Sequence, residues 1–313
     1  MSSSPAPRLR AVGVSPPGRF DLISLADRRA GMARIADAGL DHVFFADHVS
    51  FKTGMGMDGM VQAAALSQLH PTLKVYLGVY LLALRHPVTV ARQLATLSEM
   101  AAGRIIFGVG VGGEDRHEME VCGIDPRTRG RRTDESLEIV RALLTGEPLD
   151  FDGEFYQLED ALIRPAPDPP IPIAIGGRSN AALDRTARFG DGWLSVWRQP
   201  ARIADDIAYI ETKATELGRE TTFSHGLQVW CGLDDDRASA RQLVAQRMEH
   251  FYRVPFEKFE PYTPFGDPAA IAEFLQPYVD AGCETLNLTM CATSMEAATE
   301  GAGEVKRLLS RSN

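Results

Sequence analysis

The sequence predicts a closed (β/α)8 barrel, and three observations support this fold class. Short apolar segments alternate with helical segments along the chain, which is typical of a parallel sheet covered by helices. Most of these segments are apolar throughout, such as LKVYLGVYLL at residues 73–82, as expected for strands buried on both faces. Eight strand–helix units follow one another, the number that closes a barrel. The alternative is an open doubly wound sheet, which is disfavoured because the glycine turn at 176–177 follows the fifth strand and not the first.

Each predicted strand is an apolar run that ends at glycine, proline or polar residues. The predicted strands cover 8–15, 41–46, 73–82, 103–111, 171–175, 193–197, 223–233 and 285–290. The predicted helices have apolar residues at helical spacing and cover 25–38, 61–69, 88–101, 133–144, a stretch from about 180, 201–217, 236–251, 269–281 and 295–309. An insertion after strand 4 contains LDFDGEFYQL at 149–158, whose alternation around an Asp-Gly pair predicts a β-hairpin.

Length, composition and charge limit the possible functions. The 313 residues are 44% hydrophobic and 24% charged, and we expect one domain over 1–313 with residues 1–7 as a flexible leader. The net charge of −9 argues against nucleic acid or an anionic membrane as the main partner. No segment reaches the ~18 consecutive apolar residues that a bilayer span needs. Four widely spaced cysteines without metal-ligand spacing predict reduced thiols in a cytoplasmic protein and no metal site.

Asp47 and His48 stand at the end of the second predicted strand. In a (β/α)8 barrel the functional residues gather at the carboxyl ends of the strands. Histidine exchanges protons near neutral pH, and a carboxylate beside it can tune its charge. Both residues are therefore candidate catalytic groups. The alternative is that His48 caps the strand end through a hydrogen bond.

The fourth predicted strand ends in GVGVGGE at 108–114. Glycines there permit a flat ring to lie against the backbone, and Glu114 could accept or deliver a proton. The candidate cofactor contacts are Gly110, Gly112 and Gly113, with Glu114 as a candidate catalytic residue. The alternative is a glycine turn before a helix N-terminus, whose dipole favours the acidic residues Glu114, Asp115 and Glu118.

A second glycine turn follows the fifth predicted strand. Gly176 and Gly177 allow the backbone to approach a ligand, and free N–H groups at the start of the next helix favour an anion. The turn is a candidate phosphate site with Arg178 and Ser179 as side-chain donors. The alternative is a packing turn in which Ser179 is a simple N-cap.

Four arginines, Arg127, Arg129, Arg131 and Arg132, form a basic cluster before the helix predicted at 133–144. Such a cluster could bind the acidic tail of a cofactor. A charge run is more often a solvated face, and we expect ion pairs with Asp134 and Glu138.

Several motifs, taken together and in order, resemble the luciferase-like monooxygenase superfamily of flavin and deazaflavin oxidoreductases. The matching segments are VFFADHV (43–49), LRHPVTVARQLATLSEMAAGRIIFGVGVGG (84–113), RGRRTDESLEIVRALLTGEPLDFDGEFYQL (129–158) and PAPDPPIPIAIGGRSNAALDRTARFGDGW (165–193). The resemblance spans nearly all of the chain from the first strand to Glu304. It implies a TIM barrel whose C-terminal face holds FMN or the 5-deazaflavin coenzyme F-420.

The resemblance also implies positions for the cofactor. The ring would lie near the ends of strands two to four, with a non-proline cis peptide near Tyr80, Leu81 and Leu82, and the phosphate at the Gly176–Ser179 turn. The sequence ADH at 46–48 is similar to the deazaflavin-using branch, where the histidine, here His48, contacts the reactive part of the ring. Some sugar-phosphate dehydrogenases of that branch have Glu directly after the glycine of the fourth-strand turn, whereas here Gly113 intervenes before Glu114.

The implied function is hydride transfer between F-420 and a small organic substrate. Loops at 51–60 and 251–265 favour a rather apolar substrate. One alternative is an FMN-dependent monooxygenase that uses O2 and receives reduced flavin from a partner reductase. Another is a protein that binds flavin or deazaflavin without turnover. The resemblance further implies a homodimer.

Overall fold

The computed structural model describes residues 8–16, 23–54, 56–113 and 115–311. Its main sheet contains β1 (Ala11–Val14), β2 (His42–Phe45), β3 (Lys74–Leu81), β4 (Ile105–Gly110), β7 (Ile173–Gly176), β8 (Gly192–Ser195), β9 (Gly226–Leu233), β11 (Thr285–Cys291) and the short β10 (Phe265–Gly266). The strand order is β10-β9-β11-β1-β2-β3-β4-β7-β8, and β9 pairs with β8 as well as with β11. This additional pairing closes a sheet whose paired strands run parallel, and it confirms the predicted (β/α)8 barrel.

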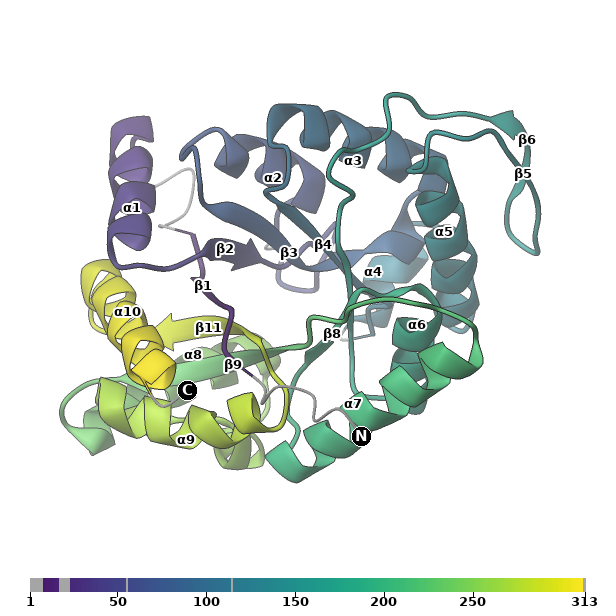
Figure 1. Cartoon of the computed structure of the whole chain (residues 1–313). Coiled ribbons are helices and arrows are strands. Elements are labelled where there is room, and N and C mark those ends of the chain that lie inside the picture. Colours follow the sequence, from purple (N-terminus) through teal and green to yellow (C-terminus); the bar gives the residue numbers. More distant parts are fainter. Residues whose placement is uncertain (1–7, 17–22, 55, 114, 312–313) are drawn as a thin grey trace. The chain divides into compact units, whose positions relative to one another are not determined.

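Helices follow the strands as predicted (Figure 1). They are α1 (Leu25–Asp37), α2 (Gly59–Ser67), α3 (Pro87–Met100), α4 (Arg116–Val121), α5 (Arg129–Leu143), α6 (Asn180–Phe189), α7 (Pro200–Glu216), α8 (Arg237–Tyr252), α9 (Pro268–Asp280) and α10 (Met295–Arg311), with 3-10 turns at Leu82–Leu84, Phe256–Lys258 and Glu260–Tyr262. Side-chain N-caps fix many of their starts, among them Ser24, Asp58, Ser179, Asp236 and Asp267. The helix predicted from residue 133 begins at Arg129, because the arginine-rich segment before it is a good helix former.

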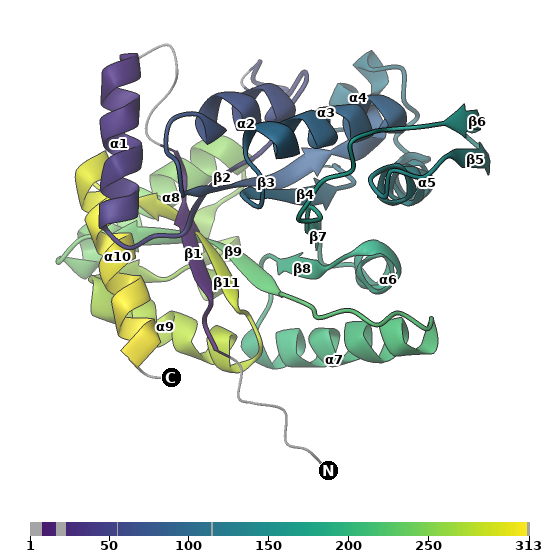
Figure 2. The same cartoon turned by 45° about the horizontal axis from the view of Figure 1, so that its top comes forward.

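The insertion after β4 contains the predicted β-hairpin. Its strands are β5 (Leu149–Asp152) and β6 (Gln157–Ala161), which pair antiparallel. The hairpin projects away from the sheet beyond α5 in both views (Figures 1 and 2). Gly153 begins the connecting loop, where its N–H donates to the carbonyl of Tyr156. The Asp-Gly pair therefore marks the start of a four-residue loop.

The chain divides into two compact units. One unit holds Met1–Phe44, Leu194–Thr212 and Phe223–Asn313, and the other holds Phe45–Trp193 and Lys213–Thr222. In the first, α9 and α10 pack side by side, and Val244, Met248, Phe256 and Cys291 form a buried cluster. In the second, Leu77, Leu94, Phe107 and Leu137 are fully buried around β3 and β4. The single domain expected over 1–313 stays a prediction.

All four cysteines are free thiols, and three of them are buried. Over the residues that the structure describes, none of the helices has both the length and the hydropathy to cross a bilayer. The same residues contain no cluster of three His, Cys, Asp or Glu side chains that could hold a metal ion.

Candidate active site

Asp47 lies two residues after the end of β2, and its side chain is 0% exposed. Arg85 donates to both carboxylate oxygens, from Nη1 at 2.6 Å and from Nη2 at 2.7 Å. The backbone N–H groups of Gly59 and Leu81 donate to the same oxygens at 2.8 and 3.0 Å. Asp47 therefore ties the carboxyl end of β2 to the end of β3 and to the start of α2. Its oxygens are occupied by donors from the protein.

Arg85 joins this carboxylate to two further groups. Its Nη2 also donates to Asp58 at 3.0 Å, and its guanidinium lies 4.5 Å from the centre of the Tyr80 ring. Burial opposes the charge of Arg85, but the hydrogen bond and the charge of Asp47 outweigh it and raise the pKa of the guanidinium. Burial also raises the pKa of Tyr80 above its usual value. Arg85 is thus a fixed cation beside a neutral phenol.

His48 is paired with a carboxylate other than the one the sequence suggested. Its Nδ1 lies 3.2 Å from Glu118 Oε2, and the two side chains are 12% and 4% exposed. Glu118 Oε1 accepts the backbone N–H groups of Val49 and Ser50 at 2.6 and 3.1 Å. The carboxylate that contacts the imidazole is therefore Glu118 in α4, and not the neighbouring Asp47.

The loop after β2 packs around the same imidazole. The ring of Phe51 lies 4.3 Å from the His48 ring, centre to centre. The His48 N–H donates to the carbonyl of Met57 at 3.2 Å, which brings the two ends of the loop together. Gly56 has φ +151°, and a Cβ there would lie 2.5 Å from the Cβ of His48. The loop therefore needs glycine at this point to close over His48.

Glu118 is a candidate site residue that the sequence analysis did not predict. Its place in an acidic segment before a helix suggested only a favourable interaction with the helix dipole. The available signal was topological, because a segment that follows β4 and a histidine that follows β2 both stand at carboxyl strand ends.

The end of β3 has a non-proline cis peptide, as expected. It is the Gly78–Val79 bond, directly before the Tyr80–Leu82 stretch near which it was predicted. Tyr80 and Leu82 are fully buried, and Leu82 begins a 3-10 turn, so these side chains form core. Whether Tyr80, Leu81 and Leu82 also contact a cofactor stays a prediction.

Val79 explains two of the predicted cofactor glycines by packing. A Cβ on Gly110 would lie 2.4 Å from Val79 Cγ2, and one on Gly176 would lie 2.8 Å from Val79 Cγ1. Both contacts are far shorter than any real carbon–carbon contact, so both glycines make room for this side chain.

The turn after β4 has a different character. Gly112 and Gly113 have φ of +68° and +134°, a conformation that side-chain-bearing residues rarely adopt. A Cβ on Gly112 would also lie 2.6 Å from the methyl carbon of Met119. Glu114, the third predicted catalytic residue, lies outside the described residues.

The turn after β7 is shaped as predicted. Gly177 has φ +126°, and its carbonyl accepts the indole N–H of Trp193 at 2.6 Å. Ser179 caps α6, since its Oγ accepts the N–H of Ala182 at 3.3 Å. Arg178 is exposed beside it. The N-cap alternative is therefore correct for Ser179, and its hydroxyl proton can still be donated to a ligand.

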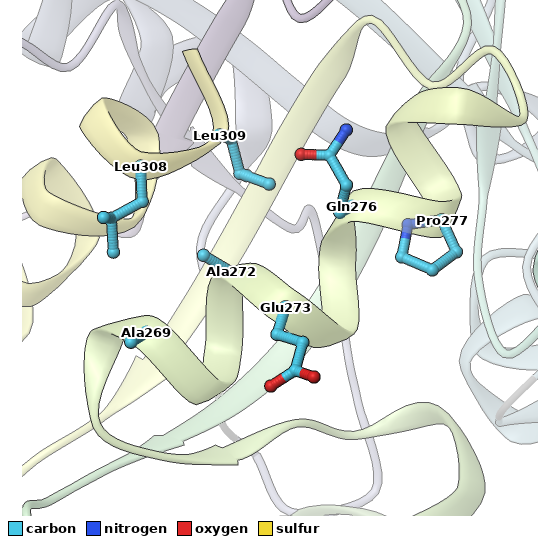
Figure 3. Close-up of a pocket in the computed structure, with 7 residues that line it drawn as sticks. All are labelled: Ala269, Ala272, Glu273, Gln276, Pro277, Leu308 and Leu309. Carbon is cyan, nitrogen blue, oxygen red and sulfur yellow. The ribbon is translucent and has the colours of Figure 1, made fainter. Parts of the chain in front are cut away.

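A separate surface pocket lies between α9 and α10 in the other unit (Figure 3). It is lined by Ala269, Ala272, Glu273, Gln276, Pro277, Leu308 and Leu309. None of the predicted site residues is among them, and Glu273 is its one ionisable side chain.

Comparison with known sequences gives consistent matches. Residues 10–285 match the family model described as luciferase-like monooxygenase. An uncharacterized protein of Mycobacterium tuberculosis is 36% identical over 167 residues, which are 53% of this chain and 57% of that protein. The F-420-dependent glucose-6-phosphate dehydrogenase of Kineococcus radiotolerans is 28% identical over 277 residues, covering 79% of this chain and 81% of that enzyme. The chain thus spans a little over half the length of the first relatives it matches.

Solved structures show the same fold. An F-420-dependent secondary alcohol dehydrogenase in complex with an F-420–acetone adduct has a TM-score of 0.83 and 19% identity, covering 96% of this chain and 99% of that one. An EDTA monooxygenase from Chelativorans has a TM-score of 0.76 and 16% identity, covering 97% and 94%. At these identities the likeness concerns the fold alone.

Proposed function

Because the chain belongs to the luciferase-like monooxygenase family, we propose that it is an oxidoreductase that moves a hydride between coenzyme F-420 and a small organic substrate. The relative from Kineococcus supports the deazaflavin, as its name states F-420 dependence. The structural observation that carries the proposal is the contact between His48, three residues after β2, and Glu118 in α4. When bound, the deazaflavin supplies a ring carbon, C5, that gives or takes the hydride.

His48 is the group that would handle the proton that accompanies the hydride. Glu118 accepts from Nδ1, so in the neutral imidazole Nε2 carries the lone pair, and in the imidazolium it carries a donatable proton. Glu118 thereby fixes which ring nitrogen faces the reactants. Asp47 would act indirectly, as a positioning residue. Its ion pair with Arg85 fixes the segment after β2 that carries His48.

The residues after β7 fit the phosphate of such a coenzyme. Gly177 adopts φ +126°, and a Cβ there would lie 3.1 Å from the Ala182 Cβ, so this backbone can stay close to a bound anion. Ser179 retains a hydroxyl proton for it, and Arg178 adds a positive charge. Gly176, Gly177, Arg178 and Ser179 would therefore hold the phosphate.

A second candidate is an FMN-dependent monooxygenase supplied with reduced flavin by a partner reductase. The description of the matching family model, luciferase-like monooxygenase, favours it. Binding of flavin without turnover is a third. The protein would act as a homodimer in each case.

A titration separates these functions. Purified protein is titrated with F-420 and with FMN, and binding is followed by absorbance and fluorescence of the ring. Tight F-420 binding without FMN binding is the expected result, and the reverse would overturn the proposal. Turnover is then tested by bleaching of F-420 absorbance with a panel of small alcohols and aldehydes.

Substitutions at two histidines test whether His48 transfers the proton that accompanies the hydride. His48→Ala should keep coenzyme affinity and lose turnover. His117→Ala is the matched control, because His117 lies in the same region with a side chain that is 71% exposed. Equal turnover in both variants would remove His48 from the mechanism.

A further inference from the structure

The arginine-rich segment at the start of α5 does not form one basic face. Arg127 pairs with Asp125 at 2.8 Å, and Arg131 pairs with Glu154. Arg132 lies 4.2 Å from the centre of the Phe155 ring. The predicted partners Asp134 and Glu138 are not used by these arginines, since Asp134 pairs instead with Arg185 at 2.6 Å.

Arg129, like Arg132, has no anionic partner among the described residues, but unlike Arg132 it does not lie over the Phe155 ring. Its Nη1 donates to the carbonyl of Pro126 at 2.6 Å. Its Nε is buried and has no hydrogen-bond partner among the same residues. A buried N–H group of a charged side chain is unfavourable without a hydrogen-bond acceptor. We therefore expect this edge of the guanidinium to bind an acceptor from a ligand.

The unpaired edge of Arg129 faces the glycine turn after β4. Its Nε and Nη2 are each 3.7 Å from the position that a Cβ would occupy on Gly113. Because Gly113 has no side chain, the space beside this edge is bordered by backbone. Nε and Nη2 together form the face of a guanidinium that binds a carboxylate or phosphate through two parallel hydrogen bonds.

We propose that Arg129 and the Gly112–Gly113 turn form an anion subsite that binds a phosphate or carboxylate group. This inference rests on the proposed function, because such groups are carried by the tail of the coenzyme. A substrate anion has the same chemistry, and the experiment below separates the two sources.

The test compares charged and uncharged forms of one coenzyme. Wild type, Arg129→Ala, Arg129→Lys and Arg127→Ala are titrated with F-420 and with its phosphate-free deazaflavin riboside. Arg127→Ala is the matched control, because it removes the same charge from an exposed, ion-paired side chain two residues away. We expect Arg129→Ala to weaken F-420 binding about 10- to 100-fold, with partial recovery in Arg129→Lys and unchanged riboside binding.

The second arm identifies a substrate anion. In that case F-420 affinity is unchanged in Arg129→Ala, but coenzyme-loaded wild type binds inorganic phosphate in calorimetry and the variant does not. The subsite is overturned if neither affinity changes, or if Arg127→Ala has the same effect as Arg129→Ala. A role for Arg129 in pairing only with Glu114 would show as equal stability losses in Arg129→Ala and Glu114→Gln with unchanged affinities.

The test of the subsite can be told apart from the test of the coenzyme. If wild type binds FMN and not F-420, the proposed function fails, and the comparison is repeated with FMN and riboflavin. If it binds neither, the titration with inorganic phosphate alone decides whether Arg129 holds an anion.

Discussion

The Nδ1 atom of His48 lies 3.2 Å from a carboxylate oxygen of Glu118, seventy residues further along the chain. The other oxygen of Glu118 accepts the N–H groups of Val49 and Ser50, which directly follow the histidine. One carboxylate thus orients the imidazole and anchors the loop that carries it. Substitutions at Glu118 should separate these two effects.

Glu118→Ala should cost about 1–2 kcal/mol of unfolding free energy, because two backbone N–H groups lose a charged acceptor. Glu118→Gln keeps an acceptor oxygen and should cost less, while still lowering kcat. Urea denaturation and steady-state kinetics measure the two quantities. Nitrogen-15 NMR of the His48 ring reports its tautomer, which should become mixed in both variants. A purely structural Glu118 would leave kcat and the tautomer of Glu118→Gln unchanged.

Asp47→Asn should be strongly destabilising, by about 3–5 kcal/mol, because it removes one partner of a buried ion pair and leaves Arg85 charged. Asp58→Asn is the control, since Asp58 also pairs with Arg85 but its side chain is 44% exposed. Asparagine caps a helix as well as aspartate, so α2 should keep its start. We expect a loss of at most about 1 kcal/mol for Asp58→Asn. Similar midpoints of denaturation for the two variants would contradict this account.

Gly110→Ala should destabilise the protein by about 1–3 kcal/mol, because the new methyl group would lie on the side chain of Val79. The double variant Gly110→Ala/Val79→Ala removes the atom 2.4 Å away and leaves the Val79 Cβ at 3.3 Å. It should therefore be more stable than the sum of the two single changes. Thermal denaturation of the four proteins in a double-mutant cycle gives the coupling. Additive losses would show that the glycine is required for another reason.

His225 should make stability depend on pH. Burial lowers the pKa of His225 to about 4, from an ordinary 6.5. Between these values the unfolded chain binds a proton that the folded protein does not, so the free energy of unfolding falls as the pH is lowered from 6.5 to 4. The loss is on the order of 3 kcal/mol.

Two matched variants test this dependence on pH. His225→Gln should flatten the curve of unfolding free energy over that window. His250→Gln, a change at an exposed histidine, should not flatten it. The same steep slope in His225→Gln as in wild type would assign the dependence to other groups.

The sequence was informative where one physical pattern dominates. Continuous apolar runs such as β3 and β9 favour buried strands, and the glycines after the β7 segment predicted the turn that begins α6. The prediction of Asp47 and His48 as site residues rests on their position after a strand of the barrel.

The contacts of the site could not be predicted, because they join distant segments. Nothing local distinguishes Glu118 from its exposed neighbour Glu120, and only the fold brings the former to His48. The close approach of Val79 to Gly110 also joins separate segments and has no local signal in the sequence. The arginine cluster was predicted to be one charged face, whereas in the structure Arg129 differs from the others by its buried Nε, which has no hydrogen-bond partner among the described residues.

The hydrogen bond from the His48 N–H to the Met57 carbonyl has a consequence for protein engineering. This bond joins the two ends of the loop, which we call its neck. Glu118 also accepts the backbone N–H groups of Val49 and Ser50 at the start of the loop. Because the entropy of closing a loop grows only slowly with its length, the segment between Phe51 and Gly56 can be exchanged or lengthened while the neck stays fixed. Libraries diversified there should change which substrates are accepted without displacing the histidine.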